Sequence, residues 1–81
     1  MLWNRILPAE AVSGALRVVL TGRSQALVEQ HRGVIGYTQN EVTVRLENGF
    51  LRIGGQGLEL AEYSPQDLCV TGRIDALEFR P

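Results

Sequence analysis

Apolar and polar residues alternate along most of this chain, and a period of two is the pattern of half-buried β-strands. The clearest example is a pair of alternating runs, Glu41 to Leu46 and Phe50 to Ile53, on either side of Asn48-Gly49. Asn-Gly in this setting predicts a β-hairpin with a type I′ turn. With Asn48 and Gly49 as the loop, four apolar side chains share one face, which should hold this register against a one-residue slip. They are the facing pairs Leu46 with Leu51 and Val44 with Ile53.

Shorter runs of the same kind predict strands elsewhere in the chain. The runs outside the hairpin are residues 16–21, 25–30, 34–38, 58–60, 68–70 and 73–79. The glycine-rich stretch 54–57 is expected to be a turn between strands, because glycine tolerates the positive φ of tight connections. In the last run, Ile74 has the opposite parity from Leu77 and Phe79, which indicates a β-bulge or bend near Ala76.

About seven or eight short strands separated by turns predict an all-β fold. We expect a single small domain, a curved antiparallel meander that closes as a small sandwich or partial barrel, with a short β-solenoid as the alternative. Pro8 and Gly14 suit the two ends of a short N-terminal helical turn. The chain therefore divides into an apolar N-terminal segment, residues 1–15, and a β domain, residues 16–81.

Length, charge and cysteine content narrow the class of protein. A chain of 81 residues buries a small core, and self-association would add to the buried surface. The net charge of −1, with no basic run, argues against nucleic-acid binding. No apolar stretch approaches the roughly 20 residues of a membrane span. With Cys69 as the single cysteine, we expect a protein of the reducing cytoplasm that neither crosses a membrane nor is secreted.

Residues for catalysis or for binding a metal or cofactor are scarce. His31 is the single histidine, and Cys69 lies between two apolar residues, where a buried and inert thiol is expected. The acidic residues lack metal-binding spacing and are typical of the polar face of a sheet. We therefore predict no catalytic, cofactor-binding or metal-binding residue, and a protein that is not an enzyme.

Five residues are candidates for contact with a protein partner. Arg45 and Arg52 are cross-strand neighbours in the predicted hairpin, and two facing positive charges suggest an acidic partner. Alternatively, Glu41, Glu47 or neighbouring strands neutralise them. His31 and Arg32 fall in an expected loop, where His31 either contacts a partner or is solvated or hydrogen-bonded. The fifth candidate is Trp3.

Trp3 belongs to an apolar start of the chain that precedes any predicted strand. Its apolar neighbours are Leu2, Ile6 and Leu7. Tryptophan is enriched at binding hot spots and at membrane surfaces, which favours a role in docking. Alternatively, these residues cover one open end of the sheet, because so small a domain needs apolar cover.

Three stretches resemble the YabP/YqfC family of sporulation proteins, and more closely its YqfC branch. They are residues 28–34, 49–55 and 70–79, and the resemblance covers the chain from Leu16 to Phe79. It implies a role in building the forespore envelope, expression in the mother cell of an endospore-forming bacterium, and a membrane-protein partner that is YqfD-like. The family supplies no catalytic residues.

Together these observations lead to one main hypothesis and one alternative. The first is a non-enzymatic assembly or interaction factor in the mother-cell cytoplasm, at the forespore membrane surface, that presents a strand edge or sheet face to its partner. Exposed strand edges also allow a homo-oligomer. The alternative is a small β module that binds a ligand on the concave side of its sheet.

Overall fold

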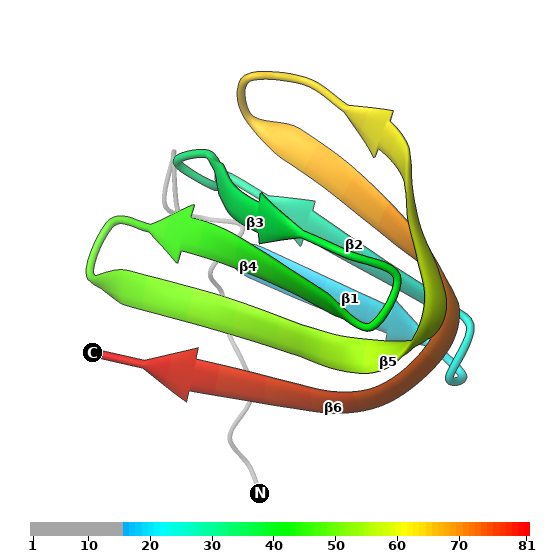
Figure 1. Cartoon of the computed structure of the whole chain (residues 1–81). Coiled ribbons are helices and arrows are strands. Elements are labelled where there is room, and N and C mark those ends of the chain that lie inside the picture. The colour runs from blue at the N-terminus through cyan, green and yellow to red at the C-terminus, as the bar shows by residue number, and fades with distance from the viewer. Residues whose placement is uncertain (1–15) are drawn as a thin grey trace, which may run out of the picture.

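The computed structural model describes residues 16–81, and six β-strands form its regular structure (Figure 1). The strands are β1 (Arg17–Thr21), β2 (Gln25–Glu29), β3 (Val34–Tyr37), β4 (Glu41–Leu46), β5 (Gly49–Tyr63) and β6 (Asp67–Arg80). All regular structure in this part of the chain is strand, which confirms the all-β prediction. The helical turn expected between Pro8 and Gly14 lies outside the described residues.

One antiparallel sheet contains all six strands, in the order β1-β2-β6-β5-β4-β3. The two long central strands, β5 and β6, pair with each other and have different outer neighbours. The first part of β6, from Asp67 to Thr71, pairs with β2, and the first part of β5, from Gly49 to Gly54, pairs with β4. Between these regions β5 and β6 bend together, and β1 and β2 come to lie across from β3 and β4 (Figure 1). The sheet folds over itself as a small open sandwich, which confirms the predicted curved antiparallel sheet.

The hydrophobic core lies between the two folded parts of the sheet. Alternation along each strand sends every second side chain inward, so Ala26 and Val28 of β2 share one core with Val42 and Val44 of β4. The long strands supply the other buried members, Leu51, Ile53, Leu58, Leu68, Val70 and Ile74. Burying a side chain of this size stabilises the fold by roughly 1.5 to 3 kcal/mol.

A β-bulge in β6 helps to bend the sheet. Gly54 pairs with Ala76 and Gly55 with Ile74, which leaves Asp75 as an extra residue on β6. An extra residue twists and bends its strand and reverses the parity of the side chains beyond it. The bulge predicted near Ala76 is confirmed, and it explains how Ile74 is buried despite its opposite parity from Leu77.

The glycine-rich stretch 54–57 does not separate two strands, so its prediction as a turn was wrong. It lies inside β5, which continues past it with a further register shift between Gln56 and Glu59. β6 similarly continues through Gly72. Six strands, two of them long, therefore replace the seven or eight short ones expected. The glycines bend paired strands here because they let two backbones approach closely.

The β4–β5 hairpin forms as expected, but its turn lies one residue earlier. Leu46 pairs with Gly49, so Glu47-Asn48 is the loop, and Asn48 lacks the positive φ of a type I′ turn. The predicted pairing was therefore wrong, and Val44 faces Leu51. The buried face is nevertheless the predicted one, because an offset of two residues preserves side-chain parity.

Replacing Gly49 by valine is expected to lower the free energy of unfolding by about 1 to 3 kcal/mol. Gly49 has φ +137°, and a Cβ atom there would overlap the backbone carbonyl oxygen of Arg80. Urea denaturation followed by circular dichroism measures the loss. Gly36→Val is the control, because Gly36 has an ordinary φ and open space around its Cβ position. A Gly49→Val protein as stable as this control would contradict the close packing of β5 against the end of β6.

Candidate functional site

The outward face of β4, β5 and β6 gathers charged side chains around one aromatic ring. Alternation in β4 buries Val42 and Val44 and turns Arg45 outward. The observed register then places Arg45 opposite Phe50, and Phe50 opposite Arg80. Arg52 lies two residues beyond Phe50 on the same face of β5. We call these four residues, Arg45, Phe50, Arg52 and Arg80, the Arg-Phe surface.

Arg45 is an exposed cation of this surface. Its guanidinium carbon lies 5.6 Å from the centroid of the Phe50 ring, the geometry of a cation–π contact. Within residues 16–81, no carboxylate lies within ion-pair distance of Arg45. The ring holds the guanidinium in place and leaves its N–H donors available to an outside acceptor.

Arg52, by contrast, is neutralised by two carboxylates. It pairs with Glu41 on β4 and, at 3.1 Å, with Glu78 on β6, which also pairs with Arg80 at 3.3 Å. Hydrogen bonding and charge from Arg80, and then from Arg52, lower the pKa of Glu78. Glu41, followed by Glu78, raises the pKa of Arg52. This exposed network contributes little stability because water screens it.

The predicted facing pair of Arg45 and Arg52 is therefore wrong. Arg45 on β4 faces Phe50 on β5, while Arg52 on β5 faces Thr43 on β4. The alternative expectation, neutralisation by nearby carboxylates, holds for Arg52 through Glu41 but not for Arg45. The sequence reasoning missed Phe50 and Arg80. Phe50 has the same strand parity as Arg52, a signal that would have placed it on the outward face.

A shallow hollow of about 340 Å³ lies beside this network, lined by Glu41, Thr43, Phe50, Arg52 and Arg80. Other hollows in the described part range from about 200 to 510 Å³. Small-molecule sites usually occupy about 300 to 1,000 Å³. Volume alone therefore does not separate a ligand-binding module from a protein-binding one.

Arg32 lies at the edge of the same region. Its backbone N–H donates to the carbonyl oxygen of Arg45, and Gly33 accepts from the Arg45 N–H, so this short connection continues the pairing of β3 with β4. The Arg32 side chain is 3.5 Å from Glu47, in the hairpin loop. Arg32 and Arg45 are thus neighbours in the fold, although they are well separated in the sequence.

His31 is a buried structural residue rather than a solvated one. Only 3% of it is exposed, and the ring lies 5.3 Å from the Tyr63 ring. Nδ1 accepts from the Gly33 N–H at 2.9 Å, so Nε2 carries the proton that it donates to the Ser64 carbonyl at 2.8 Å. The backbone N–H also donates to Gln66. His31 therefore ties the connection between β2 and β3 to the turn between β5 and β6.

Cys69 is buried in β6, where 8% of it is exposed. Burial, and to a lesser degree the charge of Glu62, raises the pKa of its thiol. Since the thiolate is the nucleophile, this environment makes Cys69 less reactive at neutral pH. The expectation of a buried cysteine is confirmed.

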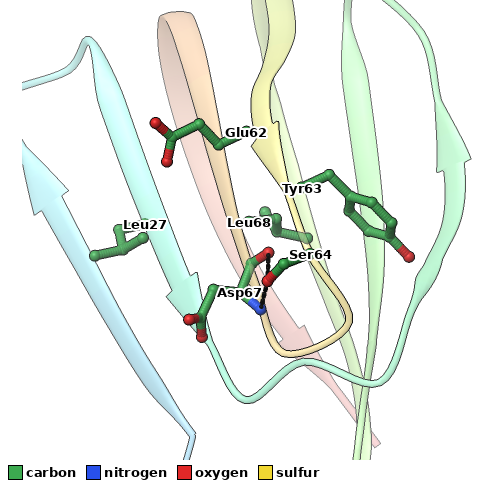
Figure 2. A pocket seen from close by; sticks show the side chains of 6 residues that line it. All are labelled: Leu27, Glu62, Tyr63, Ser64, Asp67 and Leu68. Carbon is green, nitrogen blue, oxygen red and sulfur yellow. Dashed lines mark hydrogen bonds between the residues drawn. The ribbon is translucent and has the colours of Figure 1, made fainter.

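A second hollow lies at the far end of β5 and β6, near the turn that connects them (Figure 2). Its volume is about 300 Å³, and the carboxylates of Glu62 and Asp67 lie on one side of it, while the Tyr63 hydroxyl points away from them. The Ser64 hydroxyl closes the turn, donating to the Asp67 carbonyl at 3.1 Å and accepting from the Asp67 N–H at 3.0 Å. Within residues 16–81, no group of three or more potential metal ligands occurs here or elsewhere.

Known proteins are similar to this chain over nearly its whole length. The YabP family matches residues 13–81. The chain belongs to the YabP family. It is also 26% identical over 73 residues to the uncharacterized protein YqfC of Bacillus subtilis (strain 168), covering 90% of this chain and 78% of that protein. These matches confirm the expected family and the resemblance to YqfC. No solved structure matches the chain.

In this YabP-family chain, the three stretches that carried the resemblance are parts of the framework. Residues 28–34 contain buried His31, and residues 49–55 pair with the last part of residues 70–79 through the bulged centre of the sheet. Trp3, the remaining candidate, lies outside the described residues. The part of the chain that the structure describes contains no helix long and apolar enough to cross a membrane.

Proposed function

We propose that this chain is a non-enzymatic assembly or interaction factor of sporulation that works on the forespore envelope from the mother-cell cytoplasm. Membership of the YabP family, which is associated with sporulation, supports the process. The two residues most suited to nucleophilic or acid–base chemistry support the absence of catalysis. His31 uses both ring nitrogens in structural hydrogen bonds, and the Cys69 thiol has a raised pKa.

The Arg-Phe surface is the docking site in this proposal, and Arg45 is the observation that carries it. A guanidinium held over an aromatic ring, without a carboxylate of its own among the described residues, is suited to bind one supplied by a partner. Arginine and aromatic residues are also enriched at interface hot spots. The expected partner is an acidic segment of a membrane-bound sporulation protein, of the YqfD-like kind that the family resemblance implies.

Arg45→Ala and Phe50→Ala are each expected to reduce capture of the membrane partner by about tenfold, the scale of a hot-spot residue. The measurement is affinity capture of the tagged chain from detergent-solubilised sporulating cells, with quantitative mass spectrometry and spore counts. Arg17→Ala is the matched control, because Arg17 is an exposed strand arginine already paired with Glu29 at 3.0 Å. Arg45→Lys should bind weakly, because it keeps the charge but loses the planar pair of donors.

Folded Arg45→Ala and Phe50→Ala proteins that capture the same membrane protein as wild type would remove the Arg-Phe surface from the proposal. Capture that is kept in both of these variants but lost in the Arg17→Ala control would place the docking surface on the other part of the sheet.

A further inference from the structure

One side of the sandwich is open and apolar. It lies between the outer edge of β1 and the last part of β6, where a hollow of about 510 Å³ is found. Five apolar side chains line it, Leu16, Val18, Leu20, Leu77 and Phe79. Leu20 is 47% exposed and Phe79 is 60% exposed, which leaves two large apolar side chains of β1 and β6 open to solvent. We call this hollow the open seam.

The strand edges along the open seam lack backbone partners in the described part of the chain. β1 pairs only with β2, and β2 leaves β6 after Thr71. The turn between β1 and β2 reaches β6 as far as Ile74, whose N–H donates to the Arg23 carbonyl at 2.7 Å. From Leu77 onward, β6 is paired with β5 alone. Exposed edges of this kind, beside apolar side chains, are places where another extended segment can add.

The opposite side of the sandwich is closed by contrast. There the Tyr37 hydroxyl of β3 bridges to β5, donating to the Leu58 carbonyl at 3.3 Å and accepting from the Leu60 N–H at 3.3 Å. The Leu58 N–H also donates to the Gln39 carbonyl at 2.8 Å. On this side β3 and the connection after it thus bond to β5. On the other side, within residues 16–81, β1 and the last part of β6 are not paired with each other, and apolar side chains lie between them.

We propose that the chain's own N-terminal segment covers the open seam, with Leu2, Trp3, Ile6 and Leu7 placed against the hollow. The segment enters the fold at Leu16, which itself lines the seam. Fifteen extended residues reach up to about 50 Å, whereas the five residues of β1 measure about 17 Å, so the segment can reverse and return along this edge. Covalent attachment gives it an effective concentration near the millimolar range, above that of a second copy in solution.

This occupant also matches the chemistry of the site. The hollow is lined by aliphatic side chains and one phenylalanine ring, and the segment offers aliphatic side chains and one indole. Trp3 would bury a large apolar area where no other described element covers the core. The open seam and the Arg-Phe surface lie on opposite faces of β6, because Phe79 and Arg80 are consecutive in a strand. The inference therefore stands apart from the proposed function.

Trp3 is the single tryptophan of the chain, so fluorescence reports its environment alone. In the full-length protein, the emission maximum should lie at a shorter wavelength than in urea, and acrylamide should quench it several-fold less. Light scattering after gel filtration should show a monomer under the same conditions. Leu20→Ser and Phe79→Ser should each shift the emission toward that of the unfolded chain and restore quenching, while Phe79→Leu should not.

Ile35→Ser is the matched control, because Ile35 is 48% exposed on β3, the other edge strand of the sheet. It should leave Trp3 protected. Free quenching of Trp3 in the folded monomer would overturn the proposal. So would protection that appears only with concentration-dependent dimers, which would make a second copy the occupant. Protection that survives both seam substitutions but is lost in Ile35→Ser would place Trp3 at another edge. Because both seam residues are about half exposed, their serine variants should fold, and circular dichroism checks this.

Discussion

Replacing Gly72 by alanine is expected to destabilise the protein by about 3 to 5 kcal/mol, enough to leave much of it unfolded at 37 °C. Gly72 has φ +121°, a conformation that strains any residue with a Cβ atom. The added Cβ would also overlap the carbonyl oxygen of Gly57 and lie 3.0 Å from the Cα atom of Leu58. Both obstacles are backbone atoms of β5, at the centre of the bend, where neither strand can move without disturbing the core.

Equilibrium unfolding in urea measures this loss, and Gly36→Ala is the control. Gly36 has an ordinary φ and no atom within 4 Å of its Cβ position, so alanine there should change stability by no more than about 0.5 kcal/mol. Equal stability of the Gly72→Ala and Gly36→Ala proteins would show that β5 and β6 are not held this closely at the bend.

Replacing His31 by alanine is expected to cost about 2 to 4 kcal/mol. The substitution leaves the Gly33 N–H and the Ser64 carbonyl without their hydrogen-bond partner, and it removes the ring that packs beside Tyr63. Thermal and urea unfolding measure the loss. Arg32→Ala is the control, because the neighbouring Arg32 side chain is about half exposed and makes one weak ion pair at 3.5 Å.

His31→Ala also tests the absence of catalysis when it is combined with Cys69→Ala. Cys69→Ala combined with His31→Ala should support spore formation in proportion to the amount of folded protein, since we assign both residues to the framework. Cys69→Ala alone should cost a little stability through a small cavity. A double variant that is fully folded at low temperature but forms almost no spores would instead make one of these residues a functional group.

The candidate docking surface was partly visible in the sequence. The sequence predicts Arg45 and Arg52 as outward residues of a hairpin, and the structure places both on the outward face. Their environments differ, because the third strand of this face, β6, brings Glu78 to Arg52 and Arg80 to Phe50. Those contacts join residues 26 and 30 positions apart, and no local pattern encodes them.

The burial of His31 could not be predicted from the sequence either. Its neighbours Arg32 and Gly33 are typical of a solvated loop, and nothing local indicates a buried ring. The ring is buried because the connection from β2 to β3 crosses the turn between β5 and β6, where Ser64 and Gln66 supply backbone carbonyls. A residue's burial in a folded sheet depends on which distant turn lies over it.

The sequence by itself determined the fold class, the inward face of the hairpin and the bulge beside Ala76. Each of these follows from side-chain parity, which a period of two records directly. Only the tertiary structure decided the hairpin offset, the merging of short runs into two long bent strands, and the partners of Arg45 and Arg52. Alternation specifies pairing only up to steps of two residues, because every such step buries the same face. The choice among those steps was made by close backbone contacts between distant residues, such as Gly49 with Arg80 and Gly72 with Gly57.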